Sequence, residues 1–376
     1  MGSCMFKAGY TLYADTCIGR CIHNRIIANF QKQFGENAMH SKLTPFVFQE
    51  LLILPIPVLV NNYAYLVADL SDHIFILVDV GDATIIKRMQ VQPEAVLTTH
   101  KHWDHSGGNR LMRSTFPGLK VYGGVLDHVP DSTHNVNDGQ ELRFGKLKFT
   151  AMWTPGHTKG HTVWRLDGSD FGCADSVFTG DLLMLGGCGA AFEGPVRQLA
   201  ASLDMMKALP EETMVWPGHE LALENLELAV FIEPENISAL LKLVWAFNRR
   251  EAKVCTCPST IGEEKSYNPF LRTQDPQMLA ALGIAERVRC PNHPMTSDQI
   301  NELSFDMIIA YSAKMSQLKR AMRHAQQERN RDQRAAQPTA ANNAEPQLPQ
   351  AESPRAAALS ITYKAGNQKV TETIVA

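Results

Sequence analysis

The segment Thr99-His100-Lys101-His102-Trp103-Asp104-His105 carries four potential metal ligands within six residues. It follows Ala95–Thr98, a short apolar run that is typical of a strand. Side chains alternate between the two faces of a strand, so a strand cannot aim four ligands at one point, whereas a loop that leaves its end can. The segment therefore predicts a metal site at the end of a strand.

Three further candidate ligands stand in the same position relative to short apolar runs. They are His157, a few residues after Trp153, Asp181, shortly after Thr179, and His219, shortly after Trp216. In open α/β sheets, ligands bind at the carboxyl ends of the strands. We therefore expect these three side chains to converge on the first segment.

The candidate ligands are too many for one ion. A tetrahedral zinc takes about four ligands, whereas the sequence offers His100, His102, Asp104, His105, His157, Asp181 and His219. We expect one ion on His100, His102 and His157, a second on Asp104, His105 and His219, and Asp181 bridging the two. All donors are nitrogen or oxygen, which predicts two divalent ions, zinc first, with iron or manganese as alternatives. His161 is expected to support the site rather than to bind metal.

The composition is that of an ordinary globular protein. Of the 376 residues 44% are hydrophobic, and the net charge of −3 gives no nucleic-acid footprint. The longest apolar run, Leu51–Val60, is too short to span a bilayer and is interrupted by two prolines, so we predict a buried strand there. The eight cysteines show no regular spacing, which predicts free thiols in a reducing compartment and favours a cytoplasmic location.

Residues 1–48 are predicted to form an N-terminal arm. No secretory signal is recognisable, and Phe6 stands where a myristoylation motif has serine or threonine. Residues 7–42 are mildly basic, with apolar positions at near-helical spacing. A presequence, a membrane-surface helix with peripheral membrane contact and a loosely ordered arm all fit this pattern. A mitochondrial or membrane-associated location therefore stays open beside the cytoplasmic one.

Residues 49–219 are predicted to form a mixed, layered α/β domain. Short β-runs alternate with turn residues, and helical stretches fall at Gly108–Phe116 and Val196–Leu209. The predicted strands are Leu51–Ile56, Tyr63–Ala68, Ile74–Val78, Ala95–Thr98, Lys120–Tyr122, Leu147–Trp153, Thr162–Leu166, Val177–Thr179 and Met214–Trp216.

Residues 220–325 are predicted to form a small helical domain without strands. Apolar residues recur at helical spacing from Ile237 to Phe247, and a second helix over Thr296–Ala325 begins with a capping box of Thr296 and Gln299. Residues 326–376 are rich in glutamine, alanine, asparagine, proline and serine. This composition cannot bury a core, so we predict a disordered tail.

The ordered set of motifs resembles the metallo-β-lactamase superfamily. The motifs are His-x-His-x-Asp-His at 100–105, Thr-Pro-Gly-His at 154–157, Gly-Asp at 180–181 and Pro-Gly-His-Glu at 217–220. The segment from Pro258 to Phe270 is similar to the glyoxalase II branch, the hydroxyacylglutathione hydrolases. A narrower likeness, to one member related to this branch, covers about residues 7–325. It implies an αββα metallo-β-lactamase sandwich with a C-terminal helical domain that covers the substrate site.

The resemblance also identifies candidate substrate contacts, at which the sequence departs from the family pattern. Ala190 stands where the family has a glutathione-contacting lysine, and Phe192 and Leu221 stand where it has tyrosines. Arg272 is retained, but Asp275 follows it. Each lost charge-assisted hydrogen bond would weaken binding by about 1.5–3 kcal/mol. The resemblance thus predicts intact metal machinery and a weakened glutathione clamp.

The function that the resemblance implies is hydrolysis of a small-molecule thioester, an acyl-glutathione such as S-lactoylglutathione. A metal-bridging hydroxide would attack the carbonyl, and Asp104 and Asp181 are the residues expected to act in catalysis. Two alternatives remain at this point. A mononuclear iron persulfide dioxygenase would use His100, His157 and Asp181. A regulatory protein with a weakly active site would fit the altered substrate contacts.

Overall fold

The computed structural model describes residues 39–89, 91–289, 294–335, 358–365 and 368–375, with a few helical residues between 18 and 28. Most of the predicted N-terminal arm therefore lies outside the described residues. Its last residues, however, belong to the folded domain, because Phe46–Phe48 form an edge strand. The predicted boundary at residue 48 was therefore too late, because the folded domain already includes Phe46–Phe48.

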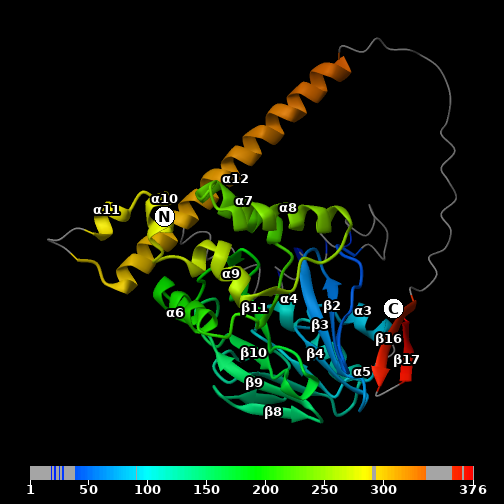
Figure 1. Cartoon of the computed structure of the whole chain (residues 1–376). Coiled ribbons are helices and arrows are strands. Elements are labelled where there is room, and N and C mark those ends of the chain that lie inside the picture. The colour runs from blue at the N-terminus through cyan, green and yellow to red at the C-terminus, as the bar shows by residue number, and fades with distance from the viewer. Residues whose placement is uncertain are drawn as a thin grey trace, which may run out of the picture.

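Two β-sheets lie at the centre of the structure (Figure 1). The first is 7-stranded in sequence order, with strands β1 to β7. They are β1 (Phe46–Phe48), β2 (Leu51–Val58), β3 (Asn62–Asp69), β4 (Ile74–Val78), β5 (Ala95–Leu97), β6 (Lys120–Gly124) and β7 (His134–Val136). The pairs from β1 to β4 are antiparallel, and those from β4 to β7 are parallel.

The second sheet is 6-stranded, in the order β15-β14-β11-β10-β9-β8. Its strands are β8 (Glu141–Phe144), β9 (Leu147–Trp153), β10 (Thr162–Leu166), β11 (Ser176–Gly180), β14 (Met214–Pro217) and β15 (Ser259–Thr260). All nine strands predicted in the α/β domain are present. The prediction that strands stop after His219 was wrong, because β15 returns to pair with β14.

The core lies between the two sheets. Tyr65, Phe149 and Trp164, with other fully buried side chains from both sheets, form one cluster. Helices α3 (Ala83–Arg88) and α5 (Asn109–Thr115) cover the outer face of the first sheet. Helix α6 (Val196–Lys207) covers the outer face of the second. This layering confirms the predicted αββα sandwich.

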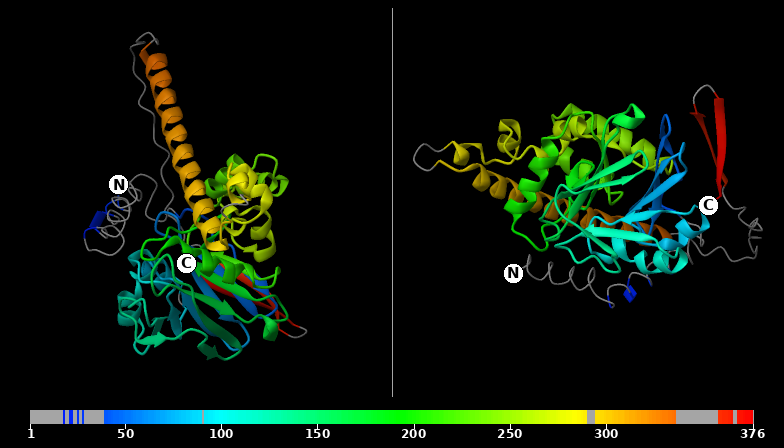
Figure 2. Two further views of the ribbon diagram at one scale, coloured as in Figure 1. Left: turned by 90° about the vertical axis from the view of Figure 1, so that its left-hand side faces the viewer. Right: turned by 90° about the horizontal axis from the view of Figure 1, so that it is seen from below.

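The C-terminal region is helical, as predicted. Its helices are α7 (Ala222–Ile232), α8 (Ile237–Glu251), α9 (Ile261–Tyr267), α10 (Pro276–Ala281), α11 (Ala285–Val288) and α12 (Ser297–Ala335). Hydrogen bonds between Thr296 and Gln299 confirm the capping box before α12. The far part of α12 extends away from the sandwich in Figures 1 and 2.

The prediction of a disordered tail from residue 326 was wrong for the residues that the structure describes. Helix α12 continues to Ala335, and β16 (Ala358–Ala365) pairs antiparallel with β17 (Gln368–Val375). The compositional argument averaged over the whole tail and missed the alternation of β-branched or aromatic residues with polar ones in 359–375, a pattern that favours strands. No described helix is long and apolar enough to cross a bilayer.

Candidate metal centre

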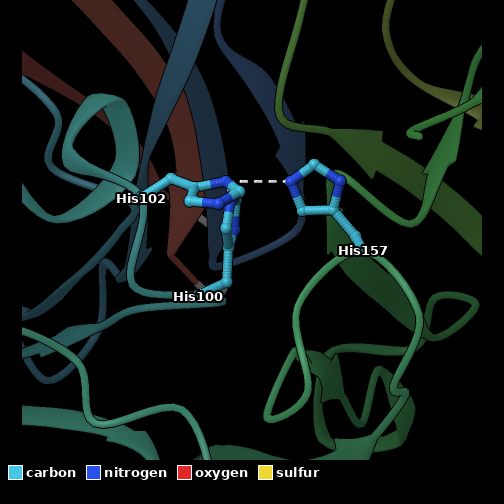
Figure 3. Close-up of side chains that lie close together, drawn as sticks. All are labelled: His100, His102 and His157. Carbon is cyan, nitrogen blue, oxygen red and sulfur yellow. Dashed lines mark hydrogen bonds between the residues drawn. The ribbon is translucent and has the colours of Figure 1, made fainter. Parts of the chain in front are cut away.

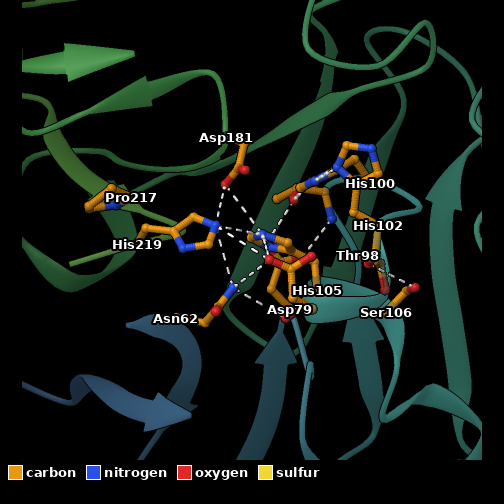
Figure 4. Close-up of polar contacts among 12 residues, drawn as sticks. Asn62, Asp79, Thr98, His100, His102, His105, Ser106, Asp181, Pro217 and His219 are labelled. Atoms are coloured by element: carbon orange, nitrogen blue, oxygen red, sulfur yellow. Dashed lines mark hydrogen bonds and ion pairs between the residues drawn. The ribbon is translucent and has the colours of Figure 1, made fainter. Parts of the chain in front are cut away.

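The candidate ligands come from four loops that follow strands. Figure 4 shows His100, His102, His105, Asp181 and His219 close together. His100 and His102 lie between β5 and the short helix α4 (Trp103–Ser106), which carries Asp104 and His105. His157 lies between β9 and β10, Asp181 directly follows β11, and His219 follows β14. The structure thus brings together all seven side chains that the sequence singled out.

The first cluster consists of His100, His102 and His157 (Figure 3). The Nδ1 atom of His102 lies 2.9 Å from Nε2 of His100 and 3.0 Å from Nε2 of His157. Ligands at about 2.0–2.1 Å from a tetrahedral ion would lie about 3.3 Å apart. The three nitrogens are therefore spaced closely enough to share one ion.

The second cluster consists of Asp104, His105 and His219. The two Nε2 atoms of its histidines are 3.3 Å apart, and they lie 3.8 and 3.6 Å from Oδ2 of Asp104. Nitrogen and carboxylate oxygen together suit a borderline cation such as zinc or iron.

Asp181 connects the two clusters. Its Oδ2 lies 3.4 Å from Nε2 of His157, whereas its Oδ1 lies 3.3 Å from Nε2 of His105 and 3.1 Å from Nε2 of His219. One oxygen thus faces each cluster, as a bridging carboxylate requires. These side chains lie in the groups that the predicted division of ligands requires, although His100 also lies close to His105 and Asp181.

The chemistry of these donors fits divalent cations. His105 Nδ1 donates to Asp79 and His157 Nδ1 donates to the carbonyl of Ala190, at 2.9 and 3.0 Å. In the neutral ring the Nε2 atom then carries a lone pair, and it points at another acceptor. Oδ1 of Asp181 is buried and makes no hydrogen bond within the described residues. Such facing acceptors repel one another unless a cation or a proton lies among them.

The pKa shifts of the cluster have the same cause. Burial lowers the pKa of His157 to about 3 and that of His102 to about 4, so both imidazoles are neutral and ready to coordinate at pH 7. Burial also opposes a charge on His105, but the carboxylates of Asp181, Asp104 and Asp79 outweigh it and raise its pKa well above the ordinary value. The three carboxylates therefore stabilise a positive charge beside His105, and a bound cation would supply one.

Several supporting residues escaped the sequence analysis. Asp79 accepts hydrogen bonds from His105 and from both the backbone and the hydroxyl of Thr99, each at 2.7–2.9 Å. Asn62 donates to Oδ2 of Asp104 at 3.1 Å, and the Asn61 side chain lies 3.2 Å from Nδ1 of His219. Such partners fix the tautomer and orientation of a ligand. Asp79 directly follows β4, so the rule that found Asp181 would have found it too.

Two glycines allow the loops to approach this closely. Gly180 has a φ of +47°, which favours glycine, and it precedes Asp181. A Cβ on Gly218 would lie 2.7 Å from the His105 ring and 2.8 Å from Oδ1 of Asp181. The Gly-Asp and Pro-Gly-His motifs thus have a steric reason.

The loop at residues 188–194 contacts the loop that carries His100 and His102 and the loop that carries His157. The Ala190 carbonyl binds His157, and the Phe192 ring packs edge-on against His102 and His157 with centroids 6.1 and 5.1 Å away. Glu193 accepts from the Lys101 ammonium and, at 2.9 Å, from the backbone N–H of Lys159. Two of the predicted substrate contacts, Ala190 and Phe192, therefore lie beside the first cluster.

Replacing Glu193 with glutamine should loosen this loop without touching a candidate ligand. Weakening the partly exposed ion pair with Lys101 costs roughly 1 kcal/mol, which predicts an approximately fivefold higher KM for a thioester substrate, with kcat changed less than about twofold. Steady-state kinetics checks this, and Glu263→Gln is the matched control, because Glu263 pairs with Lys242 elsewhere on the surface. A lower kcat at unchanged KM would contradict the prediction.

Comparison with known proteins gives the family. Residues 59–219 match the model described as the metallo-beta-lactamase superfamily, and residues 220–297 match the hydroxyacylglutathione hydrolase C-terminus. The cytoplasmic hydroxyacylglutathione hydrolase of Arabidopsis thaliana is 41% identical over 237 residues, which cover 61% of this chain and 92% of that protein. The chain belongs to the hydroxyacylglutathione hydrolase family.

Two further relatives support the assignment. A hydroxyacylglutathione hydrolase-like protein of Gallus gallus is 40% identical over 240 residues, covering 62% of this chain and 84% of that protein. A hydroxyacylglutathione hydrolase of Synechococcus sp. (strain JA-2-3B'a(2-13)) is 35% identical over 243 residues, covering 63% and 94%. The resemblance seen in the motifs is confirmed, and a metal pair is the cofactor that this superfamily and the His/Asp centre indicate.

The two other predicted substrate contacts, Leu221 and Arg272, differ in whether their side chains are free to bind a substrate. Leu221 is half-buried and immediately precedes α7, two residues after His219. Arg272 is buried, and its guanidinium is held by Glu233 and, at 3.1 Å, by Asp275. The guanidinium would have to leave two carboxylates before it could bind a substrate anion. The sequence could not show this, because Glu233 lies 39 residues away.

Proposed function

We propose that this chain is a metal-dependent thioester hydrolase that acts on an acyl-glutathione such as S-lactoylglutathione. The observation that carries the proposal is Asp181, whose two oxygens face two separate clusters of donors. The named activity of the relatives, which share both the metal domain and the C-terminal domain, supports the choice of substrate.

The residues of each cluster have a definite role in the proposal. His100, His102 and His157 would hold one ion, Asp104, His105 and His219 the second, and Asp181 both; zinc is our choice for the pair. When bound, such ions supply Lewis acidity and lower the pKa of a water molecule toward about 7. Asp79 holds the His105 ring so that its Nε2 faces the centre.

The surrounding residues determine how a substrate would approach. Phe192 closes one side of the first cluster with an apolar ring, which excludes water next to a thioester carbonyl. The thiol that corresponds to the leaving thiolate has a pKa of about 8.5, so the sulfur can leave with little general-acid help. No proton donor is therefore required beside the sulfur, which agrees with the neutral imidazoles of His102 and His157.

Kinetics on protein of known metal content tests the proposal. We expect about two divalent ions per chain and hydrolysis of S-lactoylglutathione that is lost on chelation and regained with metal. Hydrolysis of no acyl-glutathione or acyl-CoA at full metal occupancy would overturn it. About one iron per chain, with oxygen consumption on glutathione persulfide, would instead support a dioxygenase, a reading that the complete second cluster disfavours.

We also propose a cytoplasmic location, in line with the name of the Arabidopsis relative. Mitochondrial or membrane-associated placement through the N-terminal arm is the alternative. Fractionation of cells that express the full chain distinguishes the two.

A further inference from the structure

Helix α8 is apolar on two opposite sides. One side packs into the C-terminal helical region through the fully buried Ala239 and Ala246. The other side presents five large apolar side chains that are between 46% and 69% exposed: Ile237, Leu240, Leu241, Val244 and Phe247. We call these five residues the outer face of α8.

The outer face is one stripe rather than five scattered residues. At 3.6 residues per turn, the five positions fall within an arc of about 120° along about 15 Å of helix. Single exposed apolar residues need no explanation, whereas a contiguous patch marks a surface that something covers. The outer face therefore calls for an occupant.

The N-terminal segment of the chain joins the folded domain at one end of this helix. Arg250, in the last turn of α8, donates to the His40 carbonyl at 2.6 Å and to the Ser41 hydroxyl at 2.7 Å. The Lys42 N–H donates to the Lys253 carbonyl at 2.7 Å. The chain therefore enters the folded domain beside the C-terminal end of α8.

That segment offers two exposed apolar side chains among its described residues. The described residues at positions 18, 21, 22, 25 and 28 are helical, and Ile18 and Ile22, four apart, are 54% and 49% exposed. Ten residues of chain can extend up to about 33 Å, longer than α8, so the linker reaches every point along it.

The charges favour this segment over a lipid surface. No lysine or arginine stands among the five outer-face residues, and the nearest cations are engaged: Lys242 pairs with Glu263, and Arg250 with Glu220. A helix that binds anionic lipid needs free cations beside its apolar face. Asn248 and Glu251 are exposed on the same side of α8 as Phe247. The N-terminal segment carries Arg25, seven residues after Ile18, whose charge is opposite to that of Glu251.

We propose that the N-terminal segment docks on the outer face of α8 and buries Ile18 and Ile22 against it. The surface is separate from the metal centre, so the proposal does not depend on the proposed function. In the structure the outer face of α8 and the side chains of Ile18 and Ile22 are exposed to solvent, so docking would bury both.

A cross-linking experiment on the full chain tests the docking. Cys21 is an exposed thiol beside Ile22, and Asn248→Cys adds a second thiol on the same side of α8. A short bis-maleimide should link Cys21 to position 248 within one chain, with a yield at least fivefold above that of Ser114→Cys, another exposed position, on α5. Peptide mapping identifies the linked residues.

Substitutions on each face show whether the contact is specific. Ile22→Glu and Val244→Glu should each lower the intramolecular yield at least fivefold, while Leu111→Glu, another exposed apolar position, leaves it unchanged. Links only between chains would assign the face to a second copy. Equal yields for positions 248 and 114, with protection of the 248 thiol only by phosphatidylserine vesicles, would assign it to a membrane. Either result overturns the proposal.

Discussion

Replacing Asp181 with asparagine should lower kcat/KM on an acyl-glutathione thioester by on the order of a thousandfold. Asparagine has nearly the same shape but keeps only one acceptor oxygen, and it carries no charge. In the structure each oxygen of Asp181 faces a different cluster. One cluster must therefore lose its shared ligand, whichever way the amide turns.

Metal content measured with activity separates the possible causes of such a loss. We expect Asp181→Asn to retain its circular dichroism and to bind clearly fewer than two ions per chain. Asp170→Asn, which alters an exposed carboxylate outside the centre, is the matched control and should behave as wild type. Full activity and two tightly bound ions in Asp181→Asn would refute the bridging role.

The metal centre was predictable because its signal is local. The candidate ligands lie within a few residues of the ends of apolar runs, and strands of α/β sheets bring such positions to one edge. The same locality made the capping box at Thr296 predictable, because its two partners are three residues apart. Asp79 could have been found on the same ground, since it follows β4.

Contacts between distant segments were not predictable. Arg272 reads as a candidate substrate contact until the fold places Glu233 against it. The apolar repeat of α8 predicts a helix, but periodicity alone cannot say that its main stripe is exposed while Ala239 and Ala246 face the core. In the tail, average composition outweighed a short alternating pattern that forms β16 and β17.

The weakened glutathione clamp leads to the second large effect. Ala190→Lys combined with Phe192→Tyr should raise kcat/KM for S-lactoylglutathione by roughly a hundredfold or more, because each restored contact contributes about 1.5–3 kcal/mol, or roughly tenfold to over a hundredfold. Ala190 is exposed and its carbonyl binds His157, so a lysine side chain there can extend beside the first cluster without steric conflict. The Phe192 ring already packs on His102 and His157, and a hydroxyl would add only a polar group to it.

The gain should lie in KM, since contacts to the glutathione carrier are the same in the ground state and in the transition state. A thioester of the same acyl group on N-acetylcysteamine, which lacks the glutathione carboxylates, should be hydrolysed at the wild-type rate. Ser114→Lys adds the same charge at an exposed position on α5 and controls for long-range attraction.

With Arg272 held by Glu233 and Asp275, the introduced lysine would provide the main charged contact to the carrier. Unchanged turnover of S-lactoylglutathione would show that residues 190 and 192 do not limit recognition, and that the sequestered Arg272 is the better explanation for any weak activity.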